Sequence, residues 1–124
     1  MTFQTKAKHI VMLKNITQRT FLLLSVPGEI DDVTVTAATH DAITVRWSPP
    51  NKPNGQILEY MIIYNSTGGK LSGSKTTDGN KLTASIQNLI PNTTYSIFVT
   101  AKTSKGFGGK GTSVLARTRK YPKI

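Results

Sequence analysis

The sequence predicts an all-β domain built as an antiparallel sandwich or barrel. From residue 30 onward, hydrophobic residues recur at every second position, which is typical of half-buried strands rather than helices. Clusters of turn-forming residues separate these short runs, and no helical run lies between them. A chain of 124 residues with 37% hydrophobic residues can bury about one modest core. We therefore expect one globular domain.

The first two expected strands show a clean alternation. Near residues 33–36, Val33 and Val35 alternate with polar residues, and the run near residues 43–47 ends at Trp47. A dense cluster of serine, proline, asparagine and glycine follows this second run. Proline fixes φ and an Asn-Gly pair favours a turn, so we expect a loop there.

The next expected strand, near residues 57–64, is apolar on both faces. Its residues Tyr60 and Ile62 share one face, whereas Met61 and Ile63 share the other. The remaining runs predict a short edge strand and three further strands, near residues 70–76, 82–86, 95–102 and 113–118.

The net charge of +10 is unevenly distributed along the chain. Residues 1–29 hold four bases and one acid and residues 119–124 hold three bases, so residues 30–118 carry only +4. A basic chain suggests a polyanionic partner. Because no aromatic stacking platform or reading helix accompanies the bases, nucleic acid is not expected.

The sequence offers little for catalysis or for cofactor binding. No cysteine is present, which excludes disulfides, thiolate nucleophiles and cysteine zinc sites. No third group is spaced to orient either histidine, His9 or His40. Residues 106–111 satisfy the pattern G-x-G-x-x-G, but a strand follows instead of the helix that binds phosphate, so we expect a hairpin loop. We expect no enzyme, no cofactor and no metal site. The apolar run at residues 21–24 is too short to insert into a membrane.

Several of these features together resemble the fibronectin type III domain. The resemblance covers residues 27–118 and follows the order and spacing of that family's motifs. The residues that carry it are Trp47-Ser48-Pro49-Pro50, Asn54-Gly55, Tyr60-Met61-Ile62-Ile63-Tyr64, Leu89-Ile90-Pro91-Asn92-Thr93-Thr94-Tyr95 and Lys105-Gly106-Phe107-Gly108.

The resemblance implies an immunoglobulin-like, seven-stranded antiparallel Greek-key sandwich without a disulfide. It places the strands near residues 33–36, 43–47 and 82–86 in one sheet and the other four in the second. The Tyr95 hydroxyl is expected to bond the backbone near Leu89, and the core is expected to contain Trp47, Tyr60, Leu89 and Tyr95. Outside the domain, we expect a poorly ordered or partly packed extension over residues 1–26 and a disordered basic tail over residues 119–124.

The resemblance also implies a non-catalytic module in the extracellular part of a cell-surface adhesion or receptor protein. The module would act as a spacer and as a surface for a protein partner or for neighbouring domains. One alternative is a heparan sulfate-binding module that uses Lys102, Lys105, Lys110 and Arg117. Another alternative is an intracellular module of a muscle-type or enzyme-appended protein.

Two further groups of residues are candidate sites. Met61, Ile63 and Phe98 point away from the expected core on neighbouring strands, which indicates a contact surface for a protein partner. Scattered surface hydrophobes, or a face covered by residues 21–24, are the alternatives. N-glycosylation sequons occur at Asn15, Asn65 and Asn92, of which the last two are the better candidates.

Overall fold

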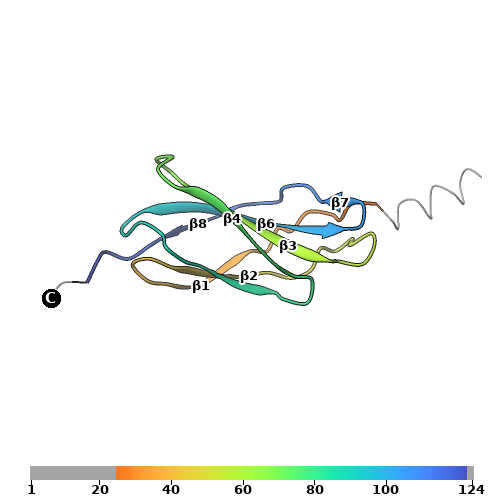
Figure 1. Cartoon of the computed structure of the whole chain (residues 1–124), viewed down its shortest axis with the longest axis horizontal. Coiled ribbons are helices and arrows are strands. Elements are labelled where there is room, and N and C mark those ends of the chain that lie inside the picture. Colours follow the sequence, from red (N-terminus) through yellow and green to blue (C-terminus); the bar gives the residue numbers. More distant parts are fainter. Residues whose placement is uncertain (1–24, 123–124) are drawn as a thin grey trace, which may run out of the picture.

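The computed structural model describes residues 25–122, which form an elongated two-layer β-sandwich (Figure 1). The two ends of the described chain lie at opposite ends of its long axis (Figure 1). Its strands are β1 (Thr34–Ala38), β2 (Ile43–Arg46), β3 (Glu59–Ser66), β4 (Ser72–Asp78), β5 (Thr83–Ile86), β6 (Thr94–Thr103), β7 (Gly106–Phe107) and β8 (Val114–Arg117).

The two sheets contain the strands that the sequence assigns to them. One sheet has the order β1-β2-β5, and the other has the order β4-β3-β6 with β7 and β8 both paired to β6. Every strand pair among the described residues is antiparallel. The expected all-β sandwich of two antiparallel sheets is therefore confirmed.

The last expected strand is present as β8, but the structure adds an eighth strand, β7, which pairs with β6 where we expected only a hairpin loop. Between β7 and β8 the chain passes close to the segment that precedes β1. A Cβ on Gly108 would collide with the carbonyl of Pro27, and one on Gly111 would collide with the carbonyl of Ile30. The glycines of the G-x-G-x-x-G pattern thus allow two backbone segments to approach each other.

The core lies between the two sheets and contains every residue expected there. Trp47, Tyr60, Leu89 and Tyr95 are all less than 5% exposed. The Trp47 and Tyr60 rings meet edge to face, with centroids 5.4 Å apart. Aromatic pairs favour this arrangement because the positive ring edge meets the negative ring face.

The turn before β6 is held to the core by one tyrosine. The hydroxyl of Tyr95 accepts a hydrogen bond of 2.8 Å from the N–H of Ile90, next to the expected position at Leu89. From the other side, the Thr118 hydroxyl donates to the carbonyl oxygen of Ile90 at 2.6 Å. Asn92, inside the turn, has a φ of 52°, a conformation that asparagine tolerates better than most residues.

Both ends of the described chain are hydrogen-bonded to the sandwich. The carbonyls of Ser25 and Val26 accept hydrogen bonds from the side chains of Thr103 and Asn54. These two residues belong to the expected extension, and residues 1–24 lie outside the described residues. At the other end, where we expected a disordered tail, Arg119 donates from its backbone to Thr39 and from its side chain to Ala38.

Replacing Tyr95 with Phe should lower the free energy of unfolding by about 1–3 kcal/mol, because the partly buried N–H of Ile90 loses its acceptor. Chemical denaturation of the full chain measures this loss. Tyr64→Phe is the matched control, since the structure shows no hydrogen bond from the Tyr64 hydroxyl within residues 25–122. Equal losses in the two variants would contradict the role given to the Tyr95 hydroxyl.

Asp32 makes the stability of the fold depend on pH. The pKa of this carboxyl lies below its ordinary value of 3.8, mainly because the Ser48 hydroxyl donates a hydrogen bond to it. Burial acts in the opposite direction and raises the pKa. The Ser48 N–H, which donates to Asp32 Oδ1 at 3.1 Å, acts in the same direction as the hydroxyl. Since the folded-state pKa is lowered, the stabilisation is fully present above the unfolded-state pKa and is lost as the pH falls through the folded-state value.

We therefore expect Asp32→Asn to be less stable than the parent chain at pH 6, with the difference shrinking once the pH falls below about 4. Asparagine keeps an oxygen acceptor for Ser48, so the comparison isolates the negative charge. Thermal unfolding at several pH values measures the effect. A difference that stays constant from pH 6 to pH 2.5 would show that the charge of Asp32 does not matter.

Candidate functional site

The three outward hydrophobic residues named by the sequence lie together on the outer face of the five-stranded sheet. Ile63 of β3 is directly opposite Phe98 of β6, and Met61 is opposite Thr100. Met61 and Ile63 are half-buried, and Phe98 is only 8% exposed although it points away from the core. We call Met61, Ile63 and Phe98 the outer patch.

Phe98 is more covered than the sequence indicates because a lysine lies over its ring. The Lys110 amine is 4.7 Å from the centre of the Phe98 ring, a cation–π distance. Lys102 lies in the same way 5.3 Å from the ring centre of Phe107 and is 3.7 Å from Glu59 Oε1. The outer patch is therefore bordered by lysines, and one of them shields its aromatic ring.

A polar atom lies buried beside the outer patch. Thr100 is 5% exposed, and its hydroxyl has no hydrogen-bond partner among the described residues. A buried hydroxyl without a partner is unfavourable by about 1–3 kcal/mol. This feature could not be predicted from the sequence, because threonine is common in strands.

Three of the four candidate polyanion-binding residues lie along the second half of β6 and the turn after it. Lys102 and Lys105 lie at the end of β6 and in the turn after it, and Lys110 reaches the same sheet from the segment before β8. Arg117 is opposite Thr94, at the other end of β6. Eight residues of strand separate Thr94 from Lys102, a distance of about 26 Å. The four residues therefore do not form one patch.

Arg117 is also engaged in local hydrogen bonds. Its guanidinium donates to Asn92 Oδ1 at 3.2 and 2.9 Å and to the Thr94 hydroxyl at 3.0 Å. The side-chain oxygen of Asn92, the asparagine of this sequon, therefore accepts hydrogen bonds that stabilise the turn. Asn65 is exposed at the end of β3 and is opposite Ser96, on the same face as the outer patch. The third sequon, at Asn15, lies outside the described residues.

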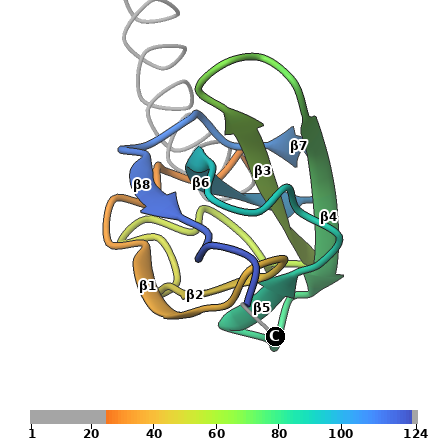
Figure 2. The same cartoon turned by 90° about the vertical axis from the view of Figure 1, so that its left-hand side faces the viewer.

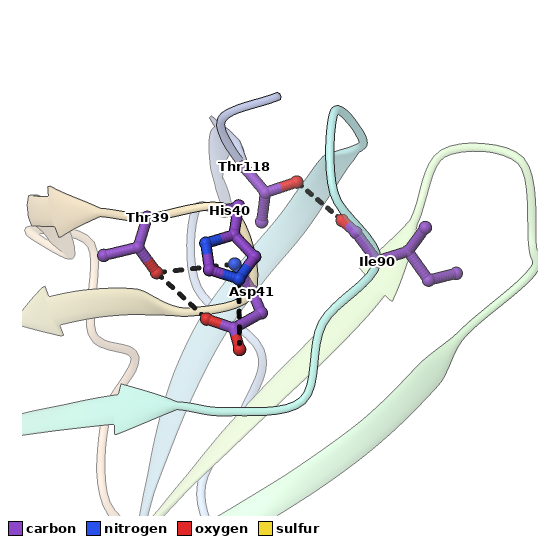
Figure 3. A network of polar contacts seen from close by, with 5 residues as sticks. All are labelled: Thr39, His40, Asp41, Ile90 and Thr118. Carbon is purple, nitrogen blue, oxygen red and sulfur yellow. Dashed lines mark hydrogen bonds and ion pairs between the residues drawn. The ribbon is translucent and has the colours of Figure 1, made fainter. Parts of the chain in front are cut away.

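The turn between β1 and β2 gathers a histidine, a carboxylate and a hydroxyl (Figure 3). His40 Nε2 is 3.7 Å from Asp41 Oδ2, and the Thr39 hydroxyl donates to Asp41 Oδ1 at 3.2 Å. Nucleophilic catalysis requires a hydroxyl bonded to the imidazole, whereas Thr39 bonds the carboxylate. The arrangement therefore stabilises a turn.

Other polar residues also have structural partners. Asp31 Oδ1 accepts hydrogen bonds from the backbone and hydroxyl of Thr112, while Asp32 bonds Ser48, so the adjacent carboxylates point to different segments. Over residues 25–122, no group of three or more metal-ligating side chains could hold a metal ion. The same part of the chain contains no helix of the length and apolarity needed to cross a bilayer.

Comparison with known proteins gives a consistent result. The family model of the Fibronectin type III domain matches residues 25–117. Human Phosphatidylinositol phosphatase PTPRQ is 37% identical over 86 residues, which are 68% of this chain and 4% of that protein. The Sortilin-related receptor of Oryctolagus cuniculus is 30% identical over 113 residues, which are 86% of this chain and 5% of that protein. The chain thus spans a small fraction of each relative.

A solved structure agrees with these sequence matches. The crystal structure of the FN5 domain of Drosophila Lar superposes with a TM-score of 0.62 at 30% identity. The superposition covers 76% of this chain and 98% of the Lar domain. The similarity therefore extends over one whole domain of that protein.

Proposed function

Because the chain belongs to the fibronectin type III family, we propose that it is a non-catalytic module of a cell-surface receptor protein, serving there as a spacer and a protein-interaction surface. Its relatives include the Sortilin-related receptor and the Phosphatidylinositol phosphatase PTPRQ, and the match spans 5% and 4% of their lengths, respectively. Chain ends at opposite ends of the long axis support the spacer role, since such modules can follow one another in a row (Figure 1).

The interaction surface that we propose is the outer patch. The observation that carries this proposal is that Met61, Ile63 and Phe98 adjoin one another on the outer face, away from the core. Met61 and Ile63 keep part of their apolar side chains exposed there, and adjoining exposed apolar side chains favour association with another protein. An extracellular location further predicts glycosylation at Asn65, which lies two residues from Ile63 on the same face.

The heparan sulfate alternative rests on Lys102, Lys105 and Lys110. Lys102 already pairs with Glu59, and Lys110 lies over Phe98, so neither amine is wholly free for a sulfate. For this reason the outer patch is the primary proposal. Heparinase treatment of target cells separates the two functions, because it removes the polyanion and leaves protein partners in place.

The test is adhesion to cells by beads coated with the full chain. A double variant, Met61→Ser with Ile63→Ser, should reduce adhesion by about tenfold or more, since burying each such side chain contributes on the order of 1.5–3 kcal/mol. Leu82→Ser is the matched control, because Leu82 is 38% exposed and adjoins β5 in the other sheet.

The adhesion of beads coated with the unaltered chain should survive heparinase treatment. Adhesion that heparinase abolishes and that the double variant retains would assign the contact to the lysines. Thermal unfolding of each variant shows whether its fold is intact.

A further inference from the structure

The open edges of the two sheets are not equivalent. β1 carries an irregularity in its register between Val35 and Ala37, which disturbs the hydrogen-bonding pattern along its edge. On the edge of β5, the carbonyl oxygen of Ser85 accepts a hydrogen bond of 2.7 Å from Lys75 Nζ. Both edges are thus modified in ways that discourage pairing with another strand.

Over the part of the chain that the structure describes, β4 has no irregularity in its register, and the one side-chain hydrogen bond to its outward backbone is that of Thr77 to the carbonyl of Asp78, at its end. It forms the right-hand margin of the five-stranded layer in Figure 2 and pairs only with β3. Its seven residues stay in continuous register with β3, without an irregularity and without proline. Apart from Lys75 and Asp78, the side chains of β4 are small and polar, so they do not hinder the approach of another strand at Ser74 and Thr76.

The hydrogen bonds at the two ends of β4 show which backbone groups face outward. The N–H of Ser66 donates to Leu71, and the N–H of Gly79 donates to Leu58. Residues that face the partner strand alternate with residues that face away. Since 71 and 79 face β3, the backbone groups of Ser74 and Thr76 point away from the sheet.

A groove of positive charge accompanies this free edge. It has a volume of about 390 Å³ and lies between β4 and β5. Lys75 and Lys81 line it, and Asp78 is the single acidic residue in its lining. Lys70, in the turn before β4, is exposed and adds a further positive charge near the same strand. The side chain of Lys75 faces inward, since this residue is opposite the buried Ile62.

The other side of β4 adjoins the outer patch. Ser74 is opposite Ile63, and Thr76 is opposite Met61. Because side chains alternate along a strand, a segment added to β4 would direct every second residue toward Lys75 and the groove. Its remaining residues would lie beside Ser74 and Thr76, on the same face as Met61 and Ile63.

From this placement we propose that β4 binds an extended segment of a partner protein by strand addition, and that this segment alternates acidic and apolar residues. Main-chain hydrogen bonds to Ser74 and Thr76 supply the binding. The carboxylates pair with Lys81 and with Lys75, whose ammonium keeps two further donors beside its hydrogen bond to Ser85. The site lies on the edge of the sheet, so it does not depend on the interaction that we propose for the face.

The probe is a seven-residue peptide that alternates Val and Glu, added to the full 124-residue chain. Amide hydrogen exchange measured by NMR should slow by about tenfold or more at Ser74 and Thr76, because their N–H groups become hydrogen-bonded. The amides of Thr83 and Ser85 on β5 should not change. No slowing at β4, or equal slowing by a peptide with Lys in place of Glu, would overturn the proposal.

A pair of variants separates backbone pairing from side-chain contact. Ser74→Pro removes an outward N–H without removing a hydrogen bond to β3, and should weaken peptide binding by about tenfold, or about 1.4 kcal/mol. Ser74→Ala keeps the N–H and should bind within about twofold of the parent chain. Equal affinity of the Pro variant and the parent chain would refute strand addition.

If Ser74→Pro does not fold, the exchange rates of the unaltered chain decide the matter. The bead-adhesion variants at Met61 and Ile63 should still bind the peptide through β4. Loss of adhesion with retention of peptide binding, or the reverse, therefore distinguishes failure of one proposal from failure of the other.

Discussion

The pairing of β3 with β6 is the constraint on which the rest of the structure depends. Eight residues of β3, Glu59–Ser66, are opposite eight residues of β6. On one face this pairing brings Tyr60 and Ile62 into the core, and on the other it places Ile63 beside Phe98. Shifting the register by one residue would exchange these faces and expose the core. The same pairing holds β3 in place as the support for β4, so both proposed surfaces depend on it.

Much of the fold could be predicted because it follows from hydrophobic alternation. The alternation identifies which strand faces are buried, and Trp47 and Tyr95 lie in the core as expected. The contact of Ile63 with β6 could be predicted in outline, since β3 is apolar on both faces and Phe98 is an outward apolar residue of β6. The resemblance added what alternation lacks, namely which strands share a sheet and where the Tyr95 hydroxyl is bonded.

What the sequence missed depends on long side chains and on contacts between loops. The position of Lys110 over Phe98 is set by the path of the segment between β7 and β8, which no periodicity encodes. Arg117 looked available for a polyanion, but it is bonded to Asn92, 25 residues away in sequence. The glycines near β7 indicated a loop, whereas their packing against Pro27 and Ile30 requires the three-dimensional structure.

Native-state amide hydrogen exchange tests the central role of the β3–β6 pairing most directly. The amides that join these two strands should belong to the slowest group, exchanging only when the whole domain unfolds. The amides that join β2 to β5 pair over only four residues, and they should exchange faster than the β3–β6 amides or at the same rate, set by global unfolding. The opposite order, with the β3–β6 amides opening while the smaller sheet stays protected, would contradict the account.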